Sequence, residues 1–174
     1  MMWSFKIVGA CLILAGAALF GIRYRNYLSR RCALLDSIHK TLKMIREKII
    51  HENELLEDSM ISCGKIYPVP EGNLFSGFAE SMDTVDSPQN RWKEYVNAYL
   101  KKNSIYTETL MSALHEFGEA WQHISSDSIA SSVESTCRLL ETELQAAETK
   151  RDKDGGLVLK TSLAVGILLI VLLI

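Results

Sequence analysis

The sequence predicts an all-α protein: a membrane-anchored helical hairpin that carries a cytoplasmic antiparallel helical bundle between its two spanning helices. Three observations lead to this prediction. An apolar run lies near each end of the 174 residues. The region between the runs places apolar residues three and four positions apart, which is the spacing of one face of an α-helix. Only 3 Pro and 10 Gly occur, and the turns that join many short strands would use more of both.

The first apolar run, residues 7–22, reads IVGACLILAGAALFGI and contains no charged residue. Lys6 precedes it, and a heavier positive cluster follows it: Arg23, Arg25, Arg30 and Arg31. Because the more basic flank of a membrane helix stays in the cytoplasm, we expect the chain after this run to be cytoplasmic. The pattern favours a retained anchor over a cleaved signal peptide, and residues 5–23 are predicted as the first transmembrane helix.

The second apolar run, residues 157–174, reads LVLKTSLAVGILLIVLLI. At about 1.5 Å per residue, residues 155–174 reach about 30 Å, the thickness of the hydrocarbon core, and are predicted as the second transmembrane helix. Its basic residues stand on its amino-terminal side: Lys150, Arg151, Lys153 and Lys160. Both anchors therefore turn their basic flank toward residues 24–154, which are predicted as the cytoplasmic bundle with both termini outside. Gly155-Gly156 is the expected hinge into the second anchor.

A long first helix is predicted to continue from the membrane into the bundle. No helix breaker separates Phe5 from Cys63, and Gly64 is the expected stop. The apolar residues of this helix form one stripe: Leu35, Ile38, Leu42, Ile45 and Ile49. We expect this stripe to face the core of the bundle.

Shorter helices complete the predicted bundle. Residues 65–73, KIYPVPEGN, are expected to form a loop, and a short helix follows over residues 74–82. Ser87-Pro88 supplies an N-cap and a first helical position for the next helix. A further helix runs to a break at residues 123–127, where Ser125 or Ser126 is expected to cap the last helix. The core positions predicted on the later helices are Trp92, Phe117, Leu140 and Leu144.

Large aromatic residues allow two interpretations. Trp92, Tyr95, Tyr99 and Trp121 could form part of the bundle core or a patch on which a partner docks. Their helical spacing favours the core, because large aromatic side chains usually bury most of their area.

Residues with catalytic chemistry do not gather in the sequence. The four histidines stand apart at His39, His51, His115 and His123, and neither an H-E-x-x-H motif nor a phosphate-binding glycine motif occurs. The three glutamates Glu52, Glu54 and Glu57 are best explained as a solvated helix face, because buried unpaired Glu is rare. The sequence therefore predicts no catalytic residue, no cofactor and no metal site.

Cysteine usage indicates the cellular compartment, and the net charge excludes one class of partner. Cys11, Cys32, Cys63 and Cys137 are isolated, without a C-x-x-C pair, and are expected to be small apolar packing residues in a reducing, cytoplasmic setting. The net charge of −2 gives no chain-wide basic field of the kind that nucleic-acid phosphate requires. Nucleic acid is therefore not an expected partner.

A set of residues occurs in a recognisable order and spacing along the chain. They are Leu42, Glu47 and Leu55 in the long helix, Phe75-x-x-Phe78-Ala79, Trp92, Phe117-Gly118-Glu119, Leu140-Glu141 and the tail from Lys160, together with the apolar amino-terminal segment. In order and spacing, these residues resemble the stage III sporulation protein AB family. The resemblance covers almost the whole chain. It departs from the family pattern after Glu119, where Leu-Gly followed by Asp and Gln gives way to Trp121-Gln122.

The resemblance implies a place in the sporulation machinery of spore-forming bacteria. It implies a bundle similar to the platform protein of type II secretion and type IV pilus machines. It also implies a position in the mother-cell membrane, in the channel complex that links mother cell and forespore. The partners implied are other stage III sporulation channel proteins and a secretion-type ATPase, with a homo-oligomer as an open alternative.

Two classes of function stay open from the sequence. The first is a non-enzymatic membrane scaffold that works with a nucleotide-driven partner. The second is a membrane-bound regulator or enzyme whose site is hidden in the bundle. The lack of a nucleophile, base or metal-ligand set in the sequence favours the scaffold, whereas ATP hydrolysis or stoichiometric metal binding by the purified protein would favour the second class.

Overall fold

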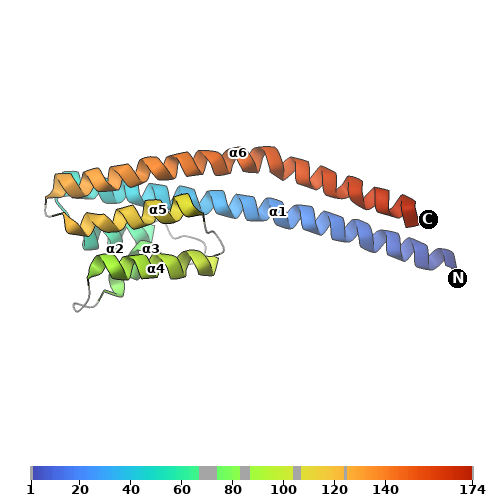
Figure 1. Ribbon diagram of the computed structural model, residues 1–174, viewed down its shortest axis with the longest axis horizontal. Coiled ribbons are helices and arrows are strands. Elements are labelled where there is room, and N and C mark those ends of the chain that lie inside the picture. The colour runs from blue at the N-terminus through green and yellow to red at the C-terminus, as the bar shows by residue number, and fades with distance from the viewer. Residues whose placement is uncertain (1, 67–73, 83–86, 104–106, 124, 174) are drawn as a thin grey trace. The chain divides into compact units, whose positions relative to one another are not determined.

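The computed structural model describes residues 2–66, 74–82, 87–103, 107–123 and 125–173 (Figure 1). Throughout these ranges the regular elements are helices and no strand occurs, which confirms the all-α prediction. The elements are α1 (Met2–Glu47), the π-helix η1 (Lys48–Glu52), α2 (Leu56–Ile66), α3 (Leu74–Glu80), α4 (Pro88–Asn103), α5 (Glu108–Phe117), the 3-10 helix η2 (Gly118–Gln122) and α6 (Ser126–Leu173).

The chain forms two compact units. Unit 1 combines Met1–Cys32 with Ala146–Ile174, and unit 2 is Ala33–Gln145. Both long helices, α1 and α6, contribute residues to each unit. The predicted domain boundaries after residues 23 and 154 separate membrane segments from the bundle and stay predictions. The compact units divide the chain at other positions, after Cys32 and after Gln145.

The first helix is shorter than predicted. α1 gives way to the π-helix η1, and the helical path then breaks at Asn53, which has a left-handed φ of 52° and donates its backbone N–H to the Lys48 carbonyl. Asn tolerates this conformation better than most residues because its short polar side chain bonds locally. The prediction of one uninterrupted helix to Cys63 was therefore wrong, since it counted only Gly and Pro as breakers.

Two glycine-based predictions were also wrong. α2 continues through Gly64, which is buried, and ends at Ile66. α6 likewise passes through Gly155 and Gly156 without interruption, so no hinge separates the last segment from the preceding helix. In both cases the hydrogen bonds of the surrounding helix outweigh the cost of about 1 kcal/mol that a single Gly imposes. Of the predicted loop at residues 65–73, residues 67–73 lie outside the described part of the chain.

Helix starts follow the capping chemistry of the sequence. α4 begins at Pro88, and the carbonyl of Ser87 accepts the backbone N–H groups of Asn90 and Arg91. α6 begins at Ser126, with the Ser125 hydroxyl accepting the N–H of Ser128 at 3.3 Å. Ser125 is therefore the cap of the last helix, one of the two residues predicted for that role.

The core of unit 2 is formed by apolar side chains from all the helices that contribute to this unit. In this unit α2 packs chiefly on α3, and α4 packs on α5 and η2. The predicted core positions that are buried are Leu35, Ile38, Leu42, Ile45, Ile49, Trp92, Phe117 and Leu140. Leu144 is only partly buried and does not belong to this core, because it lies one residue from the end of unit 2, where less of the helix is covered.

Candidate functional site

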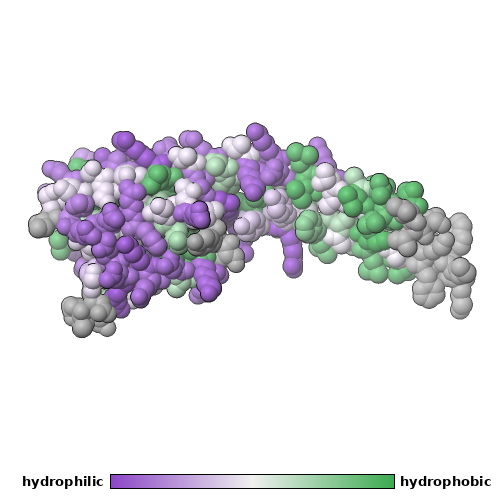
Figure 2. Space-filling model, in the orientation of Figure 1, coloured by the Kyte–Doolittle hydropathy of each residue, from purple (hydrophilic) through white to green (hydrophobic). Residues whose placement is uncertain are grey.

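Two helices are long and apolar enough to cross a membrane. They cover Val8–Glu52 and Ser126–Val171 by length and composition. Their apolar side chains in unit 1 are largely exposed: Leu12 is 69 % exposed, Phe20 63 % and Val171 74 %. Figure 2 shows these apolar residues gathered over the parts of α1 and α6 that form unit 1. A surface of this kind is typical of a helix that faces lipid.

Small residues bring α1 and α6 together in unit 1. A Cβ added at Gly21 would lie 3.1 Å from the Cα of Leu159, and one added at Gly166 would lie 3.2 Å from the Cβ of Ala17. The same addition at Gly9 or Gly16 would meet nothing within 4 Å. Close helix approach through small residues is the usual way in which membrane helices associate, and here it occurs at Gly21 and Gly166 but not at Gly9 or Gly16.

The two hydroxyl side chains of the second apolar run, Thr161 and Ser162, form hydrogen bonds within their own helix. The hydroxyl of Thr161 donates to the Leu157 carbonyl at 2.9 Å, and that of Ser162 donates to the Leu159 carbonyl at 3.0 Å. A hydroxyl that bonds to its own helix carries little cost in a membrane. These two side chains also help to line a groove of about 480 Å³ between α1 and α6, which is otherwise mainly apolar.

The predicted topology-determining residues lie on α1 and α6, next to the apolar segments. Six of them are exposed, namely Arg23, Arg25, Arg30, Lys150, Lys153 and Lys160, and Arg31 and Arg151 are partly exposed. Arg151 forms an ion pair with the neighbouring Asp152, at 2.9 Å. The Cγ of Arg25 lies 3.7 Å from the position of a Cβ on Gly155, so the Arg25 stem crosses from α1 to α6.

An aromatic cluster forms the centre of unit 2. It contains Phe75 and Phe78 from α3, Trp92 and Tyr95 from α4, Phe117 from α5 and Trp121 from η2. Neighbouring rings meet at centroid distances of 5.0 Å for Phe78 with Trp92 and 5.2 Å for Trp92 with Phe117. Trp92 is completely buried and Tyr99 nearly so, while Tyr95 and Trp121 are half-buried. The aromatic residues therefore belong mainly to the core, as their spacing indicated.

Trp92 holds α4 and α5 in register. Its indole Nε1 donates to the backbone carbonyl of Leu114, so the one polar atom of the ring is satisfied inside the core. A Cβ on Gly118 would lie 2.6 Å from Trp92 Cδ1, and one on Gly77 would lie 2.6 Å from the Tyr95 hydroxyl. The glycines of the Phe117-Gly118 and Ser76-Gly77-Phe78 segments thus make room for the aromatic rings, which sequence spacing alone did not reveal.

Two polar contacts that the sequence analysis missed stabilise the ends of helices in unit 2. Thr107 caps α5 by accepting the Leu110 N–H, and its hydroxyl donates to Glu143 of α6 at 3.1 Å. At the break after η1, Lys48 Nζ lies 2.8 Å from Glu54 Oε2 and 3.5 Å from Glu52 Oε2. The prediction that Glu52, Glu54 and Glu57 share one solvated helix face was wrong, because Glu52 lies in η1, Glu57 in α2 and Glu54 in the break between them, where it pairs with Lys48.

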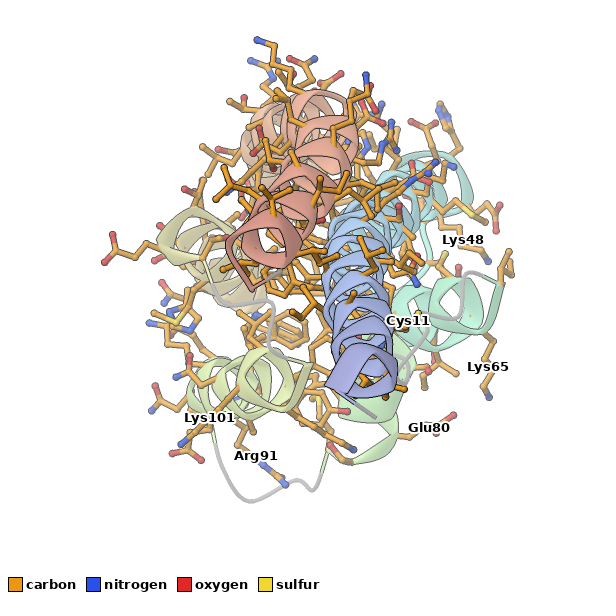
Figure 3. The ribbon with its side chains drawn as sticks, turned by 90° about the vertical axis from the view of Figure 1, so that its right-hand side faces the viewer. Cys11, Lys48, Lys65, Glu80, Arg91 and Lys101 are labelled. Atoms are coloured by element: carbon orange, nitrogen blue, oxygen red, sulfur yellow. The ribbon has the colours of Figure 1, made fainter. Side chains whose placement is uncertain are left out.

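Ion pairs also join neighbouring helices at the surface of unit 2. Lys65 and Glu80, both labelled in Figure 3, approach to 3.1 Å between α2 and α3. Arg46 Nε of α1 lies 3.0 Å from Glu134 Oε2 of α6, although this nitrogen makes no well-aligned hydrogen bond. Exposed pairs of this kind contribute about 0.2–1 kcal/mol each to the free energy of unfolding. They therefore add little to the stability that the apolar core provides.

The histidines lie on separate elements and do not form a cluster. His39 on α1 is 8 % exposed, and its Nε2 is buried without a hydrogen-bond partner. His51 pairs with Glu47 at 3.0 Å, and His115 Nε2 lies 3.2 Å from Asn97 Oδ1. Burial lowers the pKa of His39 and of His115. Among the described residues no group of three or more His, Cys, Asp or Glu side chains has the arrangement of a metal site.

The cysteines are unpaired in the part of the chain that the structure describes. Cys32, Cys63 and Cys137 are buried, and Cys11 is exposed in the apolar part of α1. Burial, with the nearby Glu134 carboxylate, raises the pKa of the Cys137 thiol to about 12. Because the thiolate is the reactive form, Cys137 acts as a packing residue.

The fold and the exposed apolar surface define an all-α protein with two helices of membrane-spanning length. The chain belongs to the stage III sporulation protein AB family, whose family model matches residues 6–174. This match covers nearly the whole chain and confirms the resemblance drawn from the sequence. Neither the curated proteins nor the solved structures that were compared with the chain gave a significant match.

Proposed function

We propose that the protein is a non-enzymatic, integral-membrane scaffold in the channel complex that links mother cell and forespore. The observation that carries the proposal is its membership of the stage III sporulation protein AB family over residues 6–174. In this proposal the chain sits in the mother-cell membrane and acts like the platform protein of a secretion machine. Its partners are other stage III channel proteins and a secretion-type ATPase, and copies of the chain associate where the complex requires it.

The two long helices support the anchoring part of this proposal. α1 and α6 expose many apolar side chains in unit 1. An apolar surface of this size is expected to be covered by a membrane or a partner rather than exposed to water. The eight topology-determining residues stand on one side of both apolar segments. The positive-inside rule then places the chain between the anchors in the cytoplasm, where an ATPase has access to unit 2.

Unit 2 supports the scaffold part. Its interior is filled by apolar and aromatic side chains, and among its described residues no group of three or more His, Cys, Asp or Glu side chains is arranged to hold a metal ion. An active site would need a base, nucleophile or metal ligands brought together in a cavity. Unit 2 also has eighteen Asp and Glu against ten Lys and Arg, a charge balance that repels nucleic-acid phosphate.

Complementation of a deletion strain tests the proposal. We expect deletion to stop spore development after engulfment, and single changes of His39, His51, His115 or His123 to Ala to restore spores, because none transfers a proton. Leu168→Arg, at a position 61 % exposed on α6, should fail, since a charge at mid-membrane costs about 2.5–3.5 kcal/mol. Loss of spores from a histidine variant that still folds and inserts would indicate a hidden active site and contradict the scaffold.

A further inference from the structure

Positive charge is concentrated in unit 1. This unit contains nine Lys and Arg residues against three Asp and Glu, the reverse of the balance in unit 2. Eight of the nine stand in two short stretches next to the apolar segments, and together they form what we term the basic collar: Arg23, Arg25, Arg30, Arg31, Lys150, Arg151, Lys153 and Lys160.

The antiparallel register of α1 and α6 brings the two stretches to the same level. Gly21 approaches Leu159, and further along α1 the Arg25 stem lies against Gly155. Still further along α1, the Cys32 thiol is close enough to α6 to feel the charge of Arg151. Successive positions on α1 therefore meet earlier positions on α6, and the basic residues of both helices lie along the same short length of the pair.

Most of the collar charge is not neutralised by the protein. In the part of the chain that the structure describes, five exposed members have no ion pair: Arg23, Arg25, Lys150, Lys153 and Lys160. Of the three acidic residues in unit 1, Asp152 is occupied by Arg151 at 2.9 Å. A group of unpaired cations in one place attracts anions from its surroundings.

The lengths of the apolar segments determine where these cations lie in a bilayer. The uncharged stretch of α1, residues 7–22 between Lys6 and Arg23, extends about 24 Å as a helix, which is less than the hydrocarbon thickness of about 30 Å. A short segment is accommodated by local thinning and by flanking side chains that reach to the headgroups. The basic collar is thereby drawn into the layer of lipid phosphates.

We propose that the basic collar binds the phosphate groups of anionic membrane lipids and so gives the protein a preference for an anionic membrane. This inference rests on the proposed membrane insertion. The occupant is a lipid headgroup because the apolar segments hold the collar at headgroup depth. Each Lys or Arg near an anionic surface contributes about fivefold in binding. A zwitterionic headgroup gives a weaker attraction, since its own cation balances the phosphate.

The test uses the full chain in mixed micelles that contain phosphatidylglycerol and phosphatidylcholine in equal amounts. The lipids that copurify with the chain are quantified by mass spectrometry. We expect phosphatidylglycerol to be enriched severalfold over phosphatidylcholine. The double variant Arg25→Gln with Lys153→Gln should lower the enrichment to near the equal proportions of the lipid mixture, because each charge removed weakens the attraction to an anionic surface. The matched control, Lys101→Gln with Lys102→Gln, removes two exposed charges from α4 and should leave the enrichment unchanged.

Salt and phosphate distinguish the sources of the phosphate group. Raising sodium chloride from about 0.1 M to about 1 M shortens the Debye length from about 10 Å to about 3 Å and should reduce the enrichment. Inorganic phosphate at equal ionic strength should reduce it no further than chloride does. If phosphate displaces the lipid more strongly than chloride, the collar binds the free ion and the lipid assignment is overturned.

The remaining outcomes separate this inference from the proposed function. Insertion is measured by flotation with phosphatidylcholine vesicles, and circular dichroism checks that each variant stays helical. A chain that fails to float with any vesicle contradicts the membrane scaffold, and this inference with it. A chain that floats but shows no phosphatidylglycerol enrichment, or loses it equally in both double variants, overturns the inference alone.

Discussion

At the scale of single residues, Trp92 connects packing with hydrogen bonding. The ring is fully buried, contacts Phe75, Phe78, Phe117 and Trp121, and donates its Nε1 hydrogen to a backbone carbonyl. Truncation removes both the contacts and the hydrogen bond. A residue in this position therefore carries a large share of the net stability of a small unit, which is about 5–15 kcal/mol for a domain.

We predict that Trp92→Ala lowers the free energy of unfolding by about 3–5 kcal/mol, the range of large-to-small changes at buried aromatic residues. Chemical denaturation of the detergent-solubilised chain measures it. Leu55→Ala is the control, because Leu55 is 71 % exposed and surface changes usually stay within about 0.5 kcal/mol. Equal losses in both variants would show that Trp92 is not a core residue in solution.

His39 gives a second prediction at this scale, on the pH dependence of stability. Burial first, and then the charge of Lys43, lower its pKa from the usual value of 6.5, while Glu141 of α6 and Asp36 act in the opposite direction and Lys40 adds to the lowering. The unfolded chain therefore binds this proton at a higher pH than the folded chain. Stability is fully present above about pH 6.5 and is lost as the pH falls from there toward the folded pKa.

Denaturation between pH 7.5 and pH 5 checks this sign, with the pH values spanning the usual histidine range of about 6.5. We expect His39→Leu to flatten the decline of stability on acidification, because the buried group that must take up a proton is gone. His123→Gln, an exposed position, is the control and should keep the wild-type decline. A wild-type slope in the His39 variant would mean that other groups, such as His115, account for the acid sensitivity.

Sequence patterns predicted buried residues better than polar contacts. The stripe from Leu35 to Ile49 follows directly from helical spacing, and each of its members is buried. The hydrogen bond from Thr107 to Glu143 joins residues 36 positions apart, and no local pattern shows which helices will meet. Leu144 fits the same spacing as Leu140, yet its exposure depends on where the surrounding unit ends.

At the scale of elements, the glycines of α1 and α6 have two different roles. Gly21 stands where α6 approaches closely, and the nearest atoms include the Leu159 backbone. Gly156 stands in open space inside a continuous helix. The sequence predicted a hinge at Gly155-Gly156, because composition alone does not tell whether a neighbour is close or whether the helix continues.

The same substitution at these two glycines should have opposite effects. Gly156→Ala should stabilise the chain by about 0.5–1 kcal/mol, since Ala is the better helix residue and its methyl group meets nothing. Gly21→Ala should destabilise it, because the methyl group would lie 3.1 Å from the Leu159 Cα and force the helices apart. Thermal unfolding followed by circular dichroism measures both. If the Gly156→Ala protein folds well but its strain fails to form spores, the result would support the hinge first predicted at this position.

The break between η1 and α2 shows the limit of reading helix ends from Gly and Pro. Asn53 adopts the left-handed conformation, and Lys48 and Glu54 pair across it at 2.8 Å. Asn was present as a stop signal, but the apolar stripe on either side made a continuous helix the simpler prediction. The start of α4 at Ser87-Pro88 was predicted correctly because Pro at the first helical position is a stronger local signal.

At the scale of the whole molecule, composition conceals two opposite charge balances. The net charge of −2 combines an acidic unit 2 with a basic unit 1. The fold class and the family follow from order along the chain, since the apolar runs and helical periods are sequence properties. Partners, topology and any assembly depend on surfaces that meet other molecules, and these are the parts for which experiments on the intact cell are needed.

The predicted membrane topology can be tested in intact cells. A variant with Cys11, Cys32, Cys63 and Cys137 changed to Ala removes every native thiol, and Asn90→Cys then places one thiol at an exposed position of α4. Because the basic flank of each anchor faces this part of the chain, we expect an impermeant thiol reagent to leave intact cells unlabelled. The same reagent should label the thiol after the membrane is permeabilised, which shows that the site is accessible in the folded chain. Labelling of intact cells would place unit 2 outside the cytoplasm, beyond the reach of a cytoplasmic ATPase, and would contradict the hairpin orientation and the proposed coupling together.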